Sequence, residues 1–234
     1  MKHHLTIRML LSAALLLLLN QQIFSQLEHE HRQRYYPDPD PLVAAKLEKW
    51  QDLKFGLLMV WGAYSQWGIV ESWSICPEDY RWCKRISGSN PQSYYDYRRE
   101  YENLITTFNP VRFNPDLWAE AAKRAGMKYV VFTTKHHDGF CMWDTKETDY
   151  KITSENCPFH TNARADVTRE ILNAFRNKDF WSGSYFSKPD WHSEYYWWPY
   201  FPPFDRNVNY DPAQYPERWE KFTRFTHNQI MELM

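Results

Sequence analysis

One stretch of the sequence, residues 114–139, constrains the fold more than any other. It reads NPDLWAEAAKRAGMKYVVFTTKHHDG and predicts a helix over about 115–125, with Asn114 as its N-cap and Gly126 ending it in the left-handed conformation. The β-rich run 128–134 follows and ends in polar residues. This order predicts a buried parallel strand that delivers side chains at its C-terminal end.

The same succession of elements recurs on both sides of this stretch. Before it, apolar positions at helical spacing predict a helix over 42–51, and a dense apolar run predicts a buried strand over 55–61. After it, we expect a helix at about 166–177, a short strand at 183–187 and a helix over 216–234. The pattern indicates repeated βα units around a parallel sheet.

The choice between sheet architectures rests on the loops. Residues 63–113 are rich in Tyr, Trp, Ser and Asn with weak periodicity, which favours a long functional loop. An open Rossmann sheet needs a Gly-rich first turn, and Gly-x-Gly-x-x-Gly does not occur in the sequence. We therefore expect an α/β fold, a (β/α)8 TIM-like barrel of which residues 42–234 supply about the first three βα units.

The first residues have the pattern of an export signal. Basic residues precede an apolar run at 9–19, and a polar segment closes near residue 25. We interpret residues 1–25 as a secretory signal peptide, because the run is shorter than the roughly 20 residues of a membrane span. Residues 26–41 are expected to form an exposed lead-in, and the protein is expected to be exported to the periplasm, the cell surface or beyond.

Composition narrows the classes of partner. The formal net charge is −1 and no basic run stands out, so we expect no nucleic-acid partner. Aromatic residues make up 18% of the chain, which favours stacking on flat apolar surfaces or a large aromatic core. The spacing of the four cysteines fits no zinc motif, and we expect neither a metal nor a cofactor.

Cysteine spacing also raises the question of disulfides. An exported chain can oxidise its cysteines, and two pairs, Cys76 with Cys83 and Cys141 with Cys157, are close enough in sequence to close small loops.

Two adjacent histidines, His136 and His137, follow the predicted strand 128–134. In an extended chain they point to opposite sides, so one can reach a ligand while the other braces a neighbour. A pair of hydrogen-bonded structural histidines is the alternative. The position at the C-terminal end of a barrel strand favours substrate contact.

Other candidates follow the remaining strands. Tyr185 and Trp191 could hold a sugar or pack in the core, and Glu71, close to Trp73, could accept a sugar hydroxyl or be a solvated loop acid. Four aspartates near strand ends are more typical of loop caps than of catalysts. They are Asp138, Asp144, Asp149 and Asp190. The aromatic cluster at 195–201 is expected to cover the edge of the fold rather than form a sugar platform.

Three segments together resemble the α-L-fucosidases of glycoside hydrolase family 29. They are KFGLLMVWGAYS at 54–65, KYVVFTTKHHDGFCMWDTKETDY at 128–150 and GSYFSKPDW at 183–191. The resemblance covers about residues 42–234. It implies a (β/α) barrel catalytic domain, usually followed by a β-sandwich, that removes terminal α-linked fucose from glycans with retention of configuration and without a cofactor.

The resemblance also implies roles for five residues. The two histidines of its HHDG motif contact fucose hydroxyls, which assigns His136 and His137 to substrate binding. The aromatic of its G-x-Y-[YHF]-S motif lies near the nucleophile, which corresponds to Tyr185. Its Glu-Trp pair after the first strand binds the sugar, which corresponds to Glu71 and Trp73.

The sequence departs from the family pattern at three points. Ser72 separates Glu71 from Trp73, and Val60 stands where the family has a fucose-binding histidine. The nucleophile and the acid/base of the family are expected beyond residue 234. A retaining α-L-fucosidase that acts on a fucosylated glycan is the expected function of a full-length counterpart. A non-catalytic fucose-binding remnant and a truncated, non-functional fragment are the alternatives.

Overall fold

The computed structural model of the chain describes residues 38–77 and 83–234. The predicted signal peptide 1–25, and the lead-in 26–41 up to residue 37, lie outside the described residues. Helix α2 (Pro41–Asp52) matches the helix predicted over 42–51 and belongs to a unit of its own. Residues 53–234 form the second unit, which carries the sheet.

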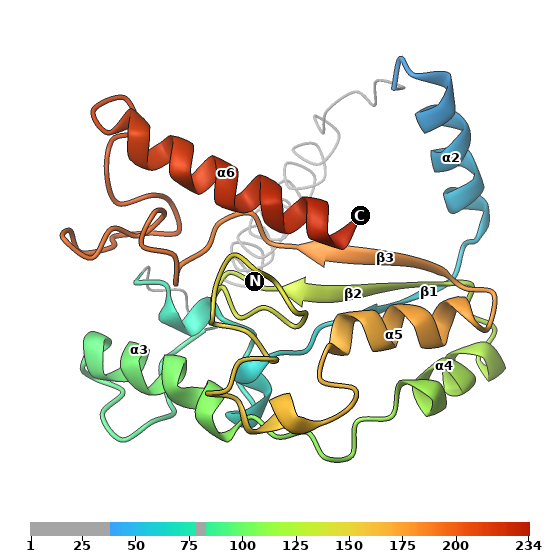
Figure 1. The fold of residues 1–234 in the computed structure, drawn as a ribbon, viewed down its shortest axis with the longest axis horizontal. Helices are drawn as coiled ribbons and strands as arrows, with labels where there is room; N and C mark the ends of the chain where they lie inside the picture. Colours follow the sequence, from blue (N-terminus) through green and yellow to red (C-terminus); the bar gives the residue numbers. More distant parts are fainter. Residues whose placement is uncertain (1–37, 78–82) are drawn as a thin grey trace, which may run out of the picture. The chain divides into compact units, whose positions relative to one another are not determined.

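The second unit is built on a parallel sheet of three strands in the order β1-β2-β3. The strands are β1 (Gly56–Met59), β2 (Tyr129–Lys135) and β3 (Trp181–Phe186). Their C-terminal ends therefore lie at the same edge of the sheet (Figure 1). This parallel order confirms the predicted α/β class, while the three described strands form an open sheet.

Burial differs between the strands. The central strand β2 contains fully buried Val130 and Phe132, as predicted for a core strand. The expectation of a buried first strand is wrong in part, since Leu58 of β1 is 61% exposed. The physical reason is position: β1 is an edge strand of the described sheet, so only β2 flanks it.

Two helices cover one face of the sheet (Figure 1). Helix α4 (Pro115–Arg124) begins where the Asn114 side chain accepts the Leu117 N–H at 3.2 Å, and Gly126 beyond its end has a φ of 83°. Helix α5 (Val167–Arg176) buries an apolar face against β2 and β3, as its periodicity predicts.

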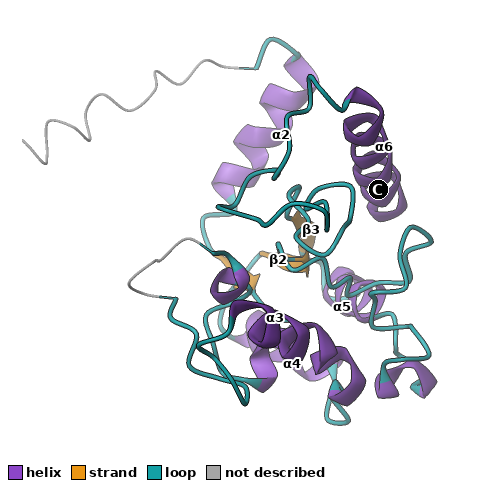
Figure 2. Ribbon diagram, turned by 90° about the vertical axis from the view of Figure 1, so that its left-hand side faces the viewer, coloured by secondary structure: helices purple, strands orange, loops and turns teal. Residues whose placement is uncertain are grey.

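Helix α6 (Pro216–Leu233) runs beside the edge strand β3, on the side away from α4 (Figure 1 and Figure 2). Its C-terminal half packs against the loop after β2. There Glu232 accepts the Trp143 Nε1–H at 3.0 Å, and Asn228 donates to Glu147 at 3.0 Å.

The long segment between β1 and β2 is more regular than predicted. The expectation of a loop over 63–113 missed helix α3 (Tyr94–Glu102), which Ser93 caps. Apolar periodicity could not reveal it, because its buried face is formed by two tyrosines, Tyr97 and Tyr101, among charged residues. No described helix is long and apolar enough to cross a membrane.

The cysteines in this structure are thiols. Cys76, Cys141 and Cys157 are buried and form no disulfide, so neither of the pairs suggested by spacing is present. Instead, the Cys141 and Cys157 thiols point to the carbonyls of Gly139 and Phe108 at 3.4 and 3.3 Å. Burial raises the pKa of Cys76 to about 11 and raises that of Cys141 further.

Candidate functional site

The candidate site lies at the C-terminal edge of the sheet, where two loops meet. Strand β2 ends at Lys135, so His136 and His137 directly follow it. The loop after β1 carries Glu71 and Trp73 to the same place. The structure thus brings together four of the five residues that the sequence singled out.

The carboxylate of Glu71 is held by two nitrogen donors. Its Oε2 atom accepts the Trp73 indole N–H at 2.8 Å and lies 3.0 Å from Nε2 of His136. Among the described residues, no hydrogen bond or ion pair involves the other oxygen, Oε1, and the side chain is 29% exposed. Glu71 therefore keeps one open acceptor for a hydroxyl group.

The backbone at Glu71 is unusual. Its φ is 48°, in the left-handed region that a residue with a side chain rarely occupies. Such a conformation costs on the order of 1–3 kcal/mol and persists only where the surroundings impose it. Here the hydrogen bonds to Trp73 and His136 hold the carboxylate in place.

His136 is neutral in this environment. It is 4% exposed, and burial, together with the adjacent His137, lowers its pKa to about 3. A carboxylate can only accept, so Nε2 carries the proton and donates to Glu71. Nδ1 is then an acceptor, and the buried hydroxyl of Ser72 donates to it. The contact between His136 and Glu71 is a hydrogen bond rather than an ion pair.

His137 lies in an aromatic cage. Its ring stacks on Trp191 at 4.8 Å and meets the edge of Trp73 at 4.9 Å between ring centroids. The backbone N–H of Trp191 also donates to the backbone carbonyl of His137 at 2.7 Å. Burial lowers the pKa of His137 as well. The loop after β3, which carries Trp191, therefore fixes the second histidine.

A buried ion pair fastens this loop to β2. Lys135 Nζ lies 2.9 Å from Asp190 Oδ2 and 2.8 Å from the Gln229 oxygen, and both charged side chains are almost fully buried. The other oxygen of Asp190 accepts the backbone N–H groups of His192 and Ser193. Gly139 packs so closely here that a Cβ on it would lie 2.3 Å from Asp190 Oδ1.

Asp138 is structural. Its oxygens accept the Tyr101 hydroxyl at 2.7 Å and the Phe140 N–H at 3.2 Å. Burial raises its pKa to about 6. Asp138 and Asp190 therefore cap loops, as expected. Asp144 braces its loop in the same way, accepting from Lys151 and Thr153.

Two positions of interest remain outside the cluster. Tyr185 in β3 is 42% exposed; its carbonyl accepts the Thr134 hydroxyl at 2.9 Å, and its side chain forms no hydrogen bond among the described residues. Its role near a nucleophile stays a prediction. Val60 directly follows β1 and is 40% exposed. Its side chain has no donor or acceptor and therefore forms no hydrogen bond.

Sequence reasoning missed two partners of the cluster. Ser72, taken as an interruption of the family pattern, supplies the donor to His136. The guanidinium of Arg206 lies 5.8 Å from the Trp73 ring, although it is 133 residues away in sequence, and no local pattern marks it. The described residues contain no group of three or more His, Cys, Asp or Glu side chains suited to a metal ion.

The arrangement suits a small hydroxylated ligand. It combines a carboxylate with one open oxygen, the imidazole of His137 and indole rings, which can bind hydroxyl groups and an apolar sugar face together. Both ring nitrogens of His136 are already bound, by Glu71 and Ser72, so His136 orients the carboxylate and has no nitrogen left for a hydroxyl group.

The family comparison agrees with this chemistry. The profile of the family described as Alpha-L-fucosidase matches residues 22–234. The tissue alpha-L-fucosidase of Bos taurus is 32% identical over 168 residues, which is 68% of this chain and 33% of that protein. The chain spans about a third of the length of the curated relatives it matches.

Solved structures show the same likeness. A GH29 alpha-L-fucosidase from Bacteroides thetaiotaomicron superimposes with a TM-score of 0.60 at 26% identity, covering 86% of this chain and 39% of the other. Alpha-L-fucosidase isoenzyme 1 from Paenibacillus thiaminolyticus gives a TM-score of 0.57 at 34% identity, covering 79% and 39%.

Proposed function

The chain belongs to the α-L-fucosidase family, glycoside hydrolase family 29, and on this premise we propose that it supplies the fucose-binding loops of a retaining α-L-fucosidase. The substrate is a glycan that carries a terminal α-L-fucose. The observation that supports this proposal best is the convergence of Glu71, Trp73, His136 and His137 at one edge of a parallel sheet.

The proposed role of each side chain follows from its contacts. Oε1 of Glu71 accepts a sugar hydroxyl, because its other oxygen is already bound by Trp73 and His136. His137 contributes an imidazole that can donate or accept, and its two indole neighbours exclude water around it. Trp73 offers an apolar face to the ring or methyl group of fucose.

The same premise extends to the architecture. We propose that residues 42–234 are the N-terminal part of a (β/α)8 barrel, with β1, β2 and β3 as its first strands. The parallel order of these strands supports the proposal, as does the position of the cluster where barrel enzymes carry their sites.

Catalysis by retention needs a nucleophilic carboxylate and a carboxylic acid/base about 5–5.5 Å apart. Asp138 and Asp190 do not suit these roles, because both are buried and bound by Tyr101 and Lys135. We assign Glu71 to binding. The nucleophile and acid/base remain expected beyond residue 234, as the family resemblance implies.

The proposal is tested by titrating the purified chain with L-fucose in a calorimeter. We expect saturable binding that Glu71→Ala weakens by about tenfold or more, since a sugar hydroxyl loses its acceptor. Glu155→Ala is the matched control, because Glu155 is an exposed acid in a turn and is not one of the cluster residues. Absence of binding, or equal binding by both variants, would contradict the proposal.

A non-catalytic fucose-binding protein is the second candidate. Val60 favours it, because valine leaves one sugar hydroxyl without a partner at a cost of roughly 1–3 kcal/mol. Hydrolysis of an aryl α-L-fucoside separates the two candidates. Turnover by the protein isolated from its own source identifies an enzyme, whereas fucose binding without turnover by that protein identifies a binding protein.

We also propose that the protein acts outside the cytoplasm. The basic and apolar pattern of residues 1–25 supports this proposal. Expression in a secreting host, followed by N-terminal sequencing, tests it. We expect a mature protein that begins near residue 26, and an intact N-terminus on a retained protein would contradict export.

A further inference from the structure

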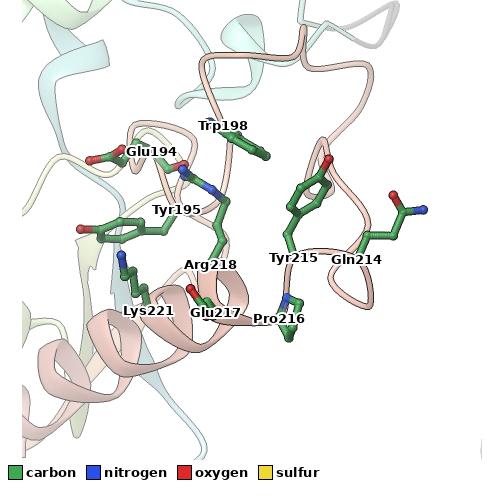
Figure 3. A pocket seen from close by; sticks show the side chains of 9 residues that line it. All are labelled: Glu194, Tyr195, Trp198, Gln214, Tyr215, Pro216, Glu217, Arg218 and Lys221. Atoms are coloured by element: carbon green, nitrogen blue, oxygen red, sulfur yellow. The ribbon is translucent and has the colours of Figure 1, made fainter.

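A cavity separate from the candidate site lies between the loop after β3 and the start of α6 (Figure 3). It has a volume of about 480 Å³ and contains none of the predicted fucose-binding residues. Aromatic rings and charged side chains line it together. The main ones are Tyr195, Trp198, Tyr215, Glu217, Arg218 and Lys221.

The aromatic walls of this cavity are fixed by their neighbours. Trp198 meets Tyr215 edge to face at 5.0 Å between ring centroids, and the Tyr210 hydroxyl donates to the Tyr195 carbonyl at 2.6 Å. The rings are therefore held in place before any ligand arrives.

Arg218 holds the floor of the cavity. Its guanidinium lies 4.1 Å from the Trp198 ring centroid, and its Nη1 donates to the Glu194 carbonyl at 2.5 Å. Figure 3 shows Arg218 and Lys221 rising from the first turns of α6 toward Trp198 and Tyr195. Because the guanidinium stacks on the Trp198 ring, its planar N–H donors have a fixed position in the cavity.

The charges that line the cavity balance. Arg218 and Lys221 are matched by Glu194 and Glu217, and the amide of Gln214 adds a neutral donor and acceptor. A balanced set selects neither an anion nor a cation, but it offers many donors and acceptors beside flat apolar rings. This combination is suited to a neutral, polyhydroxylated ring.

We propose that this cavity is a second carbohydrate-binding site, which takes a neutral hexopyranose ring of a glycan. The identification of the glycan as the ligand's source rests on the proposed function above. The site itself rests on the cavity, the stacked Arg218 and the balanced charges.

Aromatic contacts extend from the fucose cluster, which consists of Glu71, Trp73, His136 and His137, toward this site. His137 stacks on Trp191, Trp191 stacks on Trp197 at 5.1 Å, and the next residue, Trp198, lines the cavity. The sugar ring can therefore come from two sources. It can belong to the same glycan that presents fucose, or to a separate glycan on the same surface.

The test uses the full chain and a panel of neutral oligosaccharides without fucose, built from glucose, galactose, mannose or N-acetylglucosamine. Binding is followed by calorimetry and by the indole N–H resonances in NMR spectra. We expect at least one oligosaccharide to bind saturably and to shift the Trp198 resonance. No binding across the panel would overturn the proposal.

Two variants test whether the oligosaccharide binds in this cavity. Trp198→Leu is expected to weaken it about tenfold, the loss of one aromatic contact. Because Trp198 also packs on Tyr215, the double variant Gln214→Ala, Glu217→Ala removes exposed polar groups with the ring left in place and should weaken binding as well. Arg224→Gln, farther along α6, is the control.

Three outcomes separate the alternatives. Binding that both cavity variants leave unchanged overturns the proposal, as does displacement of the sugar by inorganic phosphate, which would identify an anion site. Retention in Glu71→Ala supports a site distinct from the fucose cluster, even where fucose itself fails to bind. A fucosylated oligosaccharide then identifies the source: one glycan per chain indicates a shared glycan, and two indicate separate ones.

Discussion

The cluster of Glu71, Trp73, His136 and His137 treats polar groups differently from the cavity beside α6. In the cluster, burial keeps His136 neutral and each contact has a defined donor and acceptor. In the cavity, four charged side chains remain partly or fully exposed and their charges cancel. The first arrangement selects one orientation of a small ligand, whereas the second accepts a sugar ring in several orientations.

The difference begins with the support beneath each site. The loops of this cluster are tied to three elements: Asp138, after β2, binds Tyr101 of α3, and Lys135 of β2 binds both Asp190, after β3, and Gln229 of α6. The side chains around the cavity are held mainly by the contacts of the Trp198 ring with Tyr215 and Arg218. Mutations of the first support should therefore cost more stability than mutations around the second.

The largest loss is expected from Lys135→Met. It leaves Asp190 charged, buried and without its cation, which costs about 3–5 kcal/mol in the free energy of unfolding. Urea denaturation measures it. Lys151→Met is the control, because its partner Asp144 is 62% exposed, and a loss of less than about 1 kcal/mol is expected. Equal losses would show that burial does not distinguish the two pairs.

Gly139→Ala is expected to cost about 3 kcal/mol, since the residue has a φ of 80° and the new Cβ would displace Asp190. Gly126→Ala shares the positive φ, at 83°, but its Cβ meets nothing within 4 Å. The control should lose about 1 kcal/mol. If the two variants unfold at the same urea concentration, the close packing at Gly139 does not contribute to the free energy of unfolding.

Ser72→Ala removes the hydroxyl that donates to His136 Nδ1. We expect a loss of about 1–2 kcal/mol in stability and weaker fucose binding, because the buried nitrogen loses its partner and the tautomer is no longer fixed. Ser72→Thr, which keeps the hydroxyl, should restore binding. Unchanged fucose affinity in Ser72→Ala would mean that the hydroxyl does not orient the imidazole.

Val60→His tests the departure at the end of β1. The exposed position has room for an imidazole, and the added donor should tighten fucose binding by about tenfold. Calorimetry against the parent chain measures the change. The same substitution should leave oligosaccharide binding in the cavity unaltered. Weaker fucose binding in this variant would contradict a sugar hydroxyl beside residue 60.

The smallest net effect is expected from pH. His136, with its pKa lowered from about 6.5 to about 3, contributes stability above pH 6.5 that is lost as the pH falls toward 3. Asp138, with its pKa raised to about 6, contributes stability at low pH that is lost as the pH rises through 6. The two trends oppose each other between about pH 4 and 6.

Asp138→Asn removes one of the two trends. The free energy of unfolding of this variant should rise with pH between about 4 and 6 more steeply than that of the parent chain, which urea denaturation across this range detects. Parallel profiles for the two proteins would mean that Asp138 is ionised throughout.

The sequence predicted well where local signals and burial agree. Helices α4 and α5 began and ended within a residue or two of their expected bounds, because Asn114 and Asp166 cap them and their apolar faces are periodic. Helix α3 was missed because tyrosines form its buried face. The two histidines were found from their place after β2.

Other features of the site depend on contacts that no local pattern records. Ser72 reaches His136 across 64 residues, and the pair of Lys135 and Asp190 spans 55. The cavity beside α6 joins side chains from two segments that the sequence marks only as aromatic or charged. Such features follow from the tertiary fold.

The most direct test of the account is a titration with L-fucose of the chain labelled with nitrogen-15 in both histidine and tryptophan, observed by nitrogen NMR. We predict that the ring resonances of His136 and His137 shift saturably, that His136 remains neutral throughout, and that the indole resonance of Trp198 stays in place. Saturable shifts at Trp198 with unchanged histidine resonances would contradict the assignment of fucose to the cluster.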